Sequence, residues 1–165
     1  MNESKTRVLV TGPAWMGAGI GSIETALKRL IGGAHDDIAI TAYSISSSAD
    51  PLFDWIEEAL MRGVRVQLVY NKLSRLKSTT RSKLDTLSNG YSHFHLYDFA
   101  DKKTYDLHAK AIVADRIKAI VGSSNLSVGG ILGNHEMAVL IEGPAALSVA
   151  KAIDRLLKSS YVIRQ

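Results

Sequence analysis

The chain has 165 residues, 46% of them hydrophobic, no cysteine and a formal net charge of +4. These values are typical of one soluble globular domain covering residues 1–165, and they exclude disulfide bonds and thiolate metal sites. We find no apolar run long enough for a signal peptide or a membrane span, so we expect a cytoplasmic protein without membrane contact.

Apolar runs and chain breakers alternate along the sequence and predict alternating strands and helices. The expected strands cover residues 7–11, 37–44, 64–70, 93–99 and 135–142, with a hairpin over residues 107–125. The expected helices cover residues 23–31, 51–62 and 144–160, and a further one runs toward residues 84–87. Asp50 is the expected N-cap of the second helix, because Pro51 follows at the first helical position.

The order of these elements favours one fold class. Strand, helix and strand joined by short connections indicate a parallel βαβ unit. We therefore expect an α/β fold in which a mixed, largely parallel β-sheet is flanked by helices on both faces. The glycine-rich stretch 12–22 lacks the Gly-Lys-Ser/Thr of a phosphate-binding loop, so we interpret it as a flexible loop at a strand end.

Positive charge is concentrated in one stretch of the chain. Residues 71–83 contain no acidic side chain and five basic ones, which are Lys72, Arg75, Lys77, Arg81 and Lys83. Lys102 and Lys103 follow later. A solvated helix and loop would account for such a run. Clustered Lys and Arg also bind phosphate backbones through counterion release, so the run is our candidate nucleic-acid-binding surface.

Polar residues of several kinds are expected to converge at one end of the hairpin. His108 and Lys110 are two residues apart, so on a strand they project from the same face. A turn at residues 115–116 brings the second strand back, and Ser123 and Asn125 then lie near the first pair. The hairpin thus gathers an imidazole, an ammonium, a hydroxyl and an amide at one edge of the sheet.

These groups suit the chemistry of a phosphodiester. Lys110 and the Asn125 amide can supply donors to its two anionic oxygens. A neutral histidine nitrogen of His108 can attack phosphorus, provided that a carboxylate holds the other ring nitrogen as a donor. Glu136, at the start of the next strand, is the candidate for that carboxylate.

Six residues at fixed spacing form one motif, HxKx₄Dx₆GSxN, made of His108, Lys110, Asp115, Gly122, Ser123 and Asn125. The motif is identified as that of the phospholipase D superfamily, in its single-motif, nuclease-like form. In the small nucleases of that superfamily a Glu lies eleven residues after the Asn, and Glu136 occupies that position. The likeness covers residues 38–144. It implies a phospholipase D-like fold in which Asp115 and Gly122 are structural.

The resemblance also implies a mechanism. His108 forms a covalent phosphohistidine that water resolves, Lys110 and Asn125 bind the phosphate, Ser123 assists and Glu136 orients His108. No metal and no other cofactor is expected, because Lys110 and Asn125 take the place of a divalent cation. The motif occurs once, whereas in-line displacement needs a second group to protonate the leaving oxygen. We therefore expect a homodimer that pairs two copies of His108 and has a bell-shaped dependence of rate on pH.

The motif indicates that the bond cleaved is a phosphodiester, but it does not indicate which molecule contains that bond. Small size, the basic run and the lack of a membrane-associating segment favour nucleic acid, with DNA before RNA. By analogy, an intracellular nuclease of a bacterial defence or restriction system is expected, with regulatory partner proteins that restrain it. The alternatives are a phospholipase or transphosphatidylase acting on phospholipids, and a non-catalytic DNA-binding module.

The remaining histidines and the tyrosines carry weaker signals. His93 and His95 share a strand face and could bind zinc together with His135. Their spacing is not compact, so we expect no structural metal. The tyrosines are interpreted as core or rim residues, although Tyr43 and Tyr70 end strands that point toward the expected site.

Overall fold

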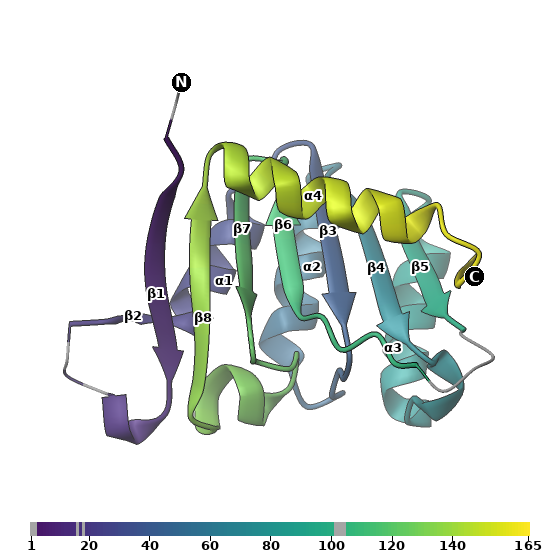
Figure 1. The fold of residues 1–165 in the computed structure, drawn as a ribbon. Helices are drawn as coiled ribbons and strands as arrows, with labels where there is room; N and C mark the ends of the chain where they lie inside the picture. The colour runs from purple at the N-terminus through teal and green to yellow at the C-terminus, as the bar shows by residue number, and fades with distance from the viewer. Residues whose placement is uncertain (1–2, 16, 18, 101–104) are drawn as a thin grey trace.

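The computed structural model describes the whole chain except residues 1–2, 16, 18 and 101–104 (Figure 1). The strands are β1 (Lys5–Thr11), β2 (Gly21–Ser22), β3 (Asp37–Ala42), β4 (Arg65–Asn71), β5 (Phe94–Phe99), β6 (Ala111–Ala114), β7 (Lys118–Gly122), β8 (Glu136–Glu142) and β9 (Val162–Arg164). The α-helices are α1 (Ile23–Gly32), α2 (Asp50–Met61), α3 (Ser78–Gly90) and α4 (Pro144–Leu157). Short helical turns cover Pro13–Trp15, Leu73–Arg75 and Gly129–Gly133.

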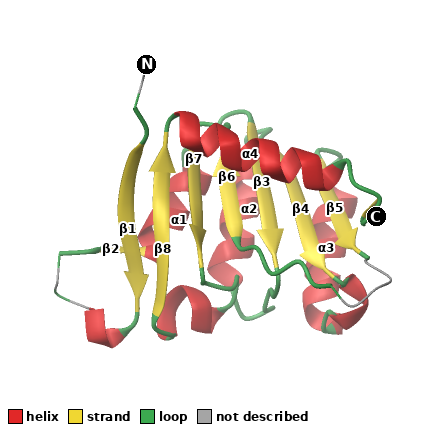
Figure 2. Ribbon diagram, viewed as in Figure 1, coloured by secondary structure: helices red, strands yellow, loops and turns green. Residues whose placement is uncertain are grey.

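The described strands form one mixed sheet in the order β2-β1-β8-β7-β6-β3-β4-β5-β9 (Figure 2). The βαβ prediction is confirmed, because β3, β4 and β5 are parallel neighbours joined through α2 and α3. The sheet as a whole is less parallel than expected. Among the described strands only β1–β2, β3–β4 and β4–β5 are parallel pairs, and the other five pairs are antiparallel.

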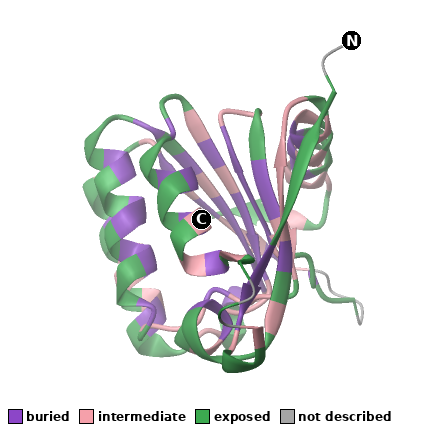
Figure 3. Cartoon of the chain, turned by 90° about the vertical axis from the view of Figure 1, so that its left-hand side faces the viewer, coloured by how far each residue is buried: buried purple, intermediate pink, exposed green. Residues whose placement is uncertain are grey.

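Helices cover both faces of the sheet, as the sequence predicts. α1, α2 and α3 lie behind the sheet in Figure 1, and α4 crosses its front. The larger core lies on the side of α1 to α3, where the helices turn their buried stripes toward the sheet (Figure 3). Small residues dominate the smaller core under α4, so this helix lies close to β6 and β7, with Ala146 and Ala150 packed near Ala111 and Ala119.

Local sequence accounts for where the helices begin. Ser22 caps α1 by accepting a hydrogen bond from the Thr25 N–H at 3.3 Å. The predicted cap of α2 is off by one residue, because Ala49 is the N-cap and Asp50 is the first helical residue. The Asp50 carboxylate pairs instead with the Lys83 ammonium, so a tertiary contact replaces the expected cap.

The N-terminal residues, which the sequence motif does not reach, belong to the sheet. β1 runs antiparallel to β8 and places Thr11 opposite Glu136. The two strands that the sequence did not predict, β2 and β9, contain two and three residues at the sheet edges. Strands this short carry no readable alternation of apolar and polar residues.

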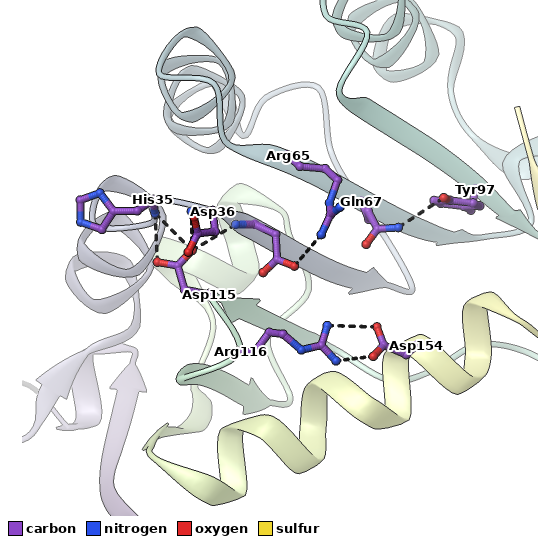
Figure 4. Close-up of polar contacts among 9 residues, drawn as sticks. His35, Asp36, Arg65, Gln67, Tyr97, Asp115, Arg116 and Asp154 are labelled. Atoms are coloured by element: carbon purple, nitrogen blue, oxygen red, sulfur yellow. Dashed lines mark hydrogen bonds and ion pairs between the residues drawn. The ribbon is translucent and has the colours of Figure 1, made fainter.

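The turn of the β6–β7 hairpin is tied to the loop before β3 (Figure 4). Asp115 and Arg116 both have positive φ, 50° and 60°, as in a two-residue hairpin turn. The Asp115 carboxylate accepts hydrogen bonds from the backbone N–H groups of His35, Asp36 and Asp37 at 2.8–3.2 Å. Burial alone would raise the pKa of this carboxyl, but the three N–H donors together lower it.

Candidate active site

The residues of the motif gather at one end of the central strands, which is called the site edge of the sheet from here on and is distinct from the outer strands β2 and β9. β3, β4 and β7 end at this edge, whereas β6 and β8 begin there (Figure 1). Ala111 pairs with Val121, and the Gly122 N–H donates to the Lys110 carbonyl at 3.2 Å. The expected convergence of the two halves of the motif is therefore present, and Asp115 lies at the opposite end of the same hairpin.

His108 and Lys110 are not on a strand, contrary to the sequence-based expectation. β6 begins at Ala111, and residues 105–110 approach it as a connection without regular secondary structure that leaves His108 exposed. Two buried side chains hold this connection in place. Thr41 Oγ1 accepts from the Ala111 N–H at 3.1 Å, and Asn71 Oδ1 accepts from the Leu107 N–H at 2.8 Å. His108 and Lys110 therefore lie just outside the sheet, and the sheet does not bury them.

The side chains of His108, Lys110 and Tyr43 form a compact cluster. The Lys110 ammonium lies 3.2 Å from Nδ1 and 3.3 Å from Nε2 of His108, and it donates to the His108 carbonyl at 2.9 Å. The Tyr43 ring lies 4.5 Å from the His108 ring and 5.2 Å from the ammonium, measured to ring centroids. Tyr43 was expected as a core or rim residue, and its place just after β3 was the only sequence signal for this contact.

Ser123 and Glu136 form a second pair beside this cluster. The Ser123 hydroxyl donates to Glu136 Oε2, and the Met137 N–H donates to the same hydroxyl at 3.3 Å. Burial lowers the pKa of Lys110, and the negative charge of Glu136 opposes that shift. In the part of the chain that the structure describes, Glu136 accepts from Ser123 and Asn134 but not from His108. Its predicted role in orienting His108 stays a prediction.

Asn125 lies in the loop that closes the site after β7. Its amide oxygen is buried without a hydrogen-bond partner, one of two such side-chain atoms among the described residues. The helical turn that starts at Gly129 packs against this loop so closely that a Cβ on Gly130 would lie 2.2 Å from the Asn125 carbonyl oxygen. The Ser124 hydroxyl donates to the Gly130 carbonyl at 2.6 Å and fastens the two segments together.

The five residues of the basic run take different positions. Lys72 and Arg75 both reach the Asp106 carboxylate, at 2.6 and 3.3 Å. The others lie on or just before α3, where Arg81 pairs with Asp85 at 2.8 Å, Lys83 pairs with Asp50, and Lys77 is exposed at the N-cap. Lys102 and Lys103 lie outside the described residues. The run therefore divides into a pair next to the His108 segment and a group on the helix.

The three histidines considered for zinc have separate contacts. His93 Nε2 lies 2.9 Å from the Leu60 carbonyl oxygen, and His95 Nδ1 lies 2.7 Å from Arg164 Nη2. His135 Nε2 accepts from the Ala14 N–H at 3.1 Å. Each histidine thus has a local role that needs no shared ligand.

Gly122 is required by the close approach of β7 and β8. A Cβ at this position would lie 2.5 Å from the Ala138 Cβ and from the Met137 carbonyl oxygen. We expect Gly122→Ala to lower the free energy of unfolding by about 2 kcal/mol and to displace Ser123, because the strands must separate to make room. Urea denaturation checks this, with Gly32→Ala as the control, since open space surrounds Gly32. Equal stability of the two variants would contradict the prediction.

None of the helices that the structure describes has the length and apolar content needed to cross a membrane.

The chain is similar to known proteins in both sequence and fold. Residues 27–159 match the family model described as cardiolipin synthase, PLD-like domain. The DISARM protein DrmC of Bacillus paralicheniformis is 29% identical over 161 residues, which are 96% of this chain and 66% of that protein. The chain thus spans slightly less than two thirds of this relative.

Two solved structures share the fold across the chain. One is Nuc of Salmonella typhimurium, a phospholipase D family member, with a TM-score of 0.78, 20% identity and 99% of each chain covered. The other is the phosphatidylserine synthase of Haemophilus influenzae, with a TM-score of 0.77, 14% identity, and coverage of 100% of this chain and 41% of that one. The enzyme class predicted from the sequence, a phosphodiesterase, has support from this family. Because the family match spans most of the chain and contains the whole motif from His108 to Asn125, the chain belongs to the phospholipase D superfamily, as a PLD-like domain.

Proposed function

We propose that residues 1–165 act as one catalytic domain, a phosphodiesterase that cleaves nucleic acid, DNA in preference to RNA, without a metal ion. The observation that carries this proposal is the cluster in which the Lys110 ammonium lies within 3.3 Å of both ring nitrogens of His108. Such a cluster places a nucleophile and a cation for the phosphate oxygens side by side.

The proposed reaction has two balanced steps. In the first, a ring nitrogen of His108 attacks phosphorus, a P–N bond forms, and the P–O bond to the leaving oxygen breaks as that oxygen takes up a proton. In the second, water attacks phosphorus, the P–N bond breaks, and the proton of the water passes to the group that acted as acid. Lys110 and the Asn125 amide hold the anionic oxygens through both steps, and Glu136 orients His108.

The proton donor of the first step is a second histidine, supplied by another copy of this chain. The motif occurs once in the sequence, and His108 is exposed at the site edge of the sheet, where a second copy can approach it. A two-fold axis beside this edge pairs His108 with His108 of the partner subunit, so that one is neutral and the other protonated.

The choice of nucleic acid rests on charge near the site, since the fold does not choose the substrate. The phosphatidylserine synthase shares this fold at a TM-score of 0.77, so a lipid substrate is the competing proposal. The basic run supports a polyanion, because Lys72 and Arg75 lie beside the segment that carries His108.

A place in a bacterial defence or restriction system is the biological setting that we propose. The similarity to the DISARM protein DrmC supports it. Partner proteins that restrain the nuclease belong to the same proposal, because unrestrained cleavage would damage the DNA of the host cell.

The direct test is cleavage of labelled single- and double-stranded DNA in excess chelator. We expect cleavage to persist, because Lys110 and Asn125 supply the charge and donors that a metal would supply. Labelled RNA and phosphatidylcholine vesicles are the parallel substrates. Cleavage that requires added Mg²⁺ would overturn the metal-independent mechanism. Hydrolysis of the phosphatidylcholine vesicles without cleavage of DNA or RNA would show that the substrate is a phospholipid.

A further inference from the structure

One carboxylate next to the proposed nucleophile is surrounded by donors. Asp106 Oδ1 accepts from Lys72 Nζ at 2.6 Å, from Arg75 Nη1 at 3.3 Å and from Asn71 Nδ2 at 3.3 Å. The Lys72 side chain is only 13% exposed, whereas the Asp106 and Arg75 side chains are 34% and 61% exposed. Two cations and an amide thus converge on one oxygen of a partly exposed carboxylate.

This group is joined to the His108 segment. Asp106 precedes His108 by two residues, so their Cα atoms are at most about 7 Å apart. Asn71 contacts Asp106 through its amide nitrogen, and its amide oxygen holds the Leu107 N–H at 2.8 Å. Leu107 itself is buried against Val69 and Phe99. The donors around Asp106 are therefore attached to the segment that carries the nucleophile.

The donor set matches what a phosphate group requires. Arg and Lys bind carboxylates and phosphates through the same charge-assisted hydrogen bonds, and amide groups add contacts to phosphate oxygens. The Lys72 ammonium and the Asn71 amide hold the pKa of Asp106 below its ordinary value, so the carboxylate is an anion at neutral pH. The place between these three donors is thus occupied by the carboxylate of Asp106.

We propose that Lys72, Arg75 and Asn71 form a subsite for a backbone phosphate neighbouring the scissile one, and that Asp106 occupies this subsite as a resident counter-anion until nucleic acid displaces it. The inference deepens the proposed function and rests on it. Its consequence is discrimination by substrate length. A polynucleotide has a second phosphate to exchange for Asp106, whereas an isolated phosphodiester has none.

Asp106→Asn is the central variant, because asparagine keeps the shape and removes the charge that competes with phosphate. The matched control is Asp154→Asn, which makes the same change in a carboxylate that is 33% exposed and pairs with Arg116, the residue at the far end of the β6–β7 hairpin (Figure 4). Arg75→Ala is the opposite variant, at a side chain exposed enough to leave folding intact. Thermal denaturation of each variant verifies the fold.

DNA affinity is measured by fluorescence anisotropy in a His108→Ala background, where no substrate is consumed. We expect Asp106→Asn to bind single-stranded DNA about threefold to tenfold more tightly than its parent, and Arg75→Ala to bind it more weakly by a similar factor. The slope of log K against log salt should steepen by up to about 0.7 in Asp106→Asn. Asp154→Asn should stay within twofold of the parent in affinity.

Kinetics in the active protein provide a second readout. Asp106→Asn should lower KM for DNA and leave kcat/KM for bis(4-nitrophenyl) phosphate within twofold of wild type. Equal DNA affinity of Asp106→Asn and Asp154→Asn, or equal changes on both substrates, would overturn the subsite while leaving the nuclease proposal intact. Wild-type protein that binds DNA but cleaves neither substrate would instead overturn the proposed function.

Discussion

Replacing His108 by alanine is expected to lower kcat for DNA cleavage by about four orders of magnitude or more, because the variant cannot form the covalent P–N bond. Affinity for DNA should stay within a few fold of wild type, since Lys110, Lys72 and Arg75 remain in place. Single-turnover cleavage and anisotropy measure the two quantities separately. A pure DNA-binding module would show no cleavage before or after the substitution, and retained cleavage in the variant would exclude His108 as the nucleophile.

His35→Ala is the matched control for this substitution. His35 is also exposed, and the contact that it makes with Asp115 uses its backbone N–H, which alanine keeps. This variant should cleave DNA at the wild-type rate.

Mixing wild-type and His108→Ala chains tests the proposal that two copies share one active site. Excess His108→Ala chain, equilibrated with wild type, should reduce the activity per wild-type chain, because each mixed dimer contains one His108 in place of two. A rate that excess variant does not change, or a monomer that is fully active at high dilution, would argue against a site shared between two copies.

Replacing Asp115 is expected to have a large effect on the stability of the fold. We expect Asp115→Ala to lower the free energy of unfolding by about 3 kcal/mol, because the backbone N–H groups of His35, Asp36 and Asp37 lose a charged acceptor at once. Asp36→Ala is the control, since the side chain of Asp36 is exposed and its N–H is unchanged. Urea denaturation of both variants measures the difference. Equal stability of the two would show that water replaces the carboxylate without cost.

The same carboxylate produces a dependence of stability on pH. The pKa of Asp115 is lowered in the folded protein, so its contribution is present above the pKa of the unfolded chain, about 3.9, and is lost as pH falls through the lower folded value. Wild type should therefore lose more stability than Asp115→Asn as the pH falls below about 4. Parallel stability curves for the two proteins over that range would contradict the assignment.

Sequence alone was enough for the parts of this protein that depend on local patterns. Apolar periodicity predicted α1, α2 and α4, because a helix that packs on a sheet must repeat its apolar residues every three or four positions. The residue types and spacing of the motif from His108 to Asn125 matched those of the superfamily. A two-strand hairpin brings the two ends of this motif together whatever surrounds it. The sequence also indicated that Glu136 joins this group of residues, but it assigned Glu136 to His108, whereas in the structure Glu136 accepts a hydrogen bond from Ser123.

The tertiary structure decided what depends on contacts between distant residues. The antiparallel pairing of β1 with β8 and the edge strands β2 and β9 arise from long-range hydrogen bonds that leave no local pattern. The contact of Tyr43 with His108, and the donors that Asn71 and Lys72 offer to Asp106, join the ends of different strands. A motif determines which chemical groups are present, whereas only the packing of the strand ends determines which other side chains reach them.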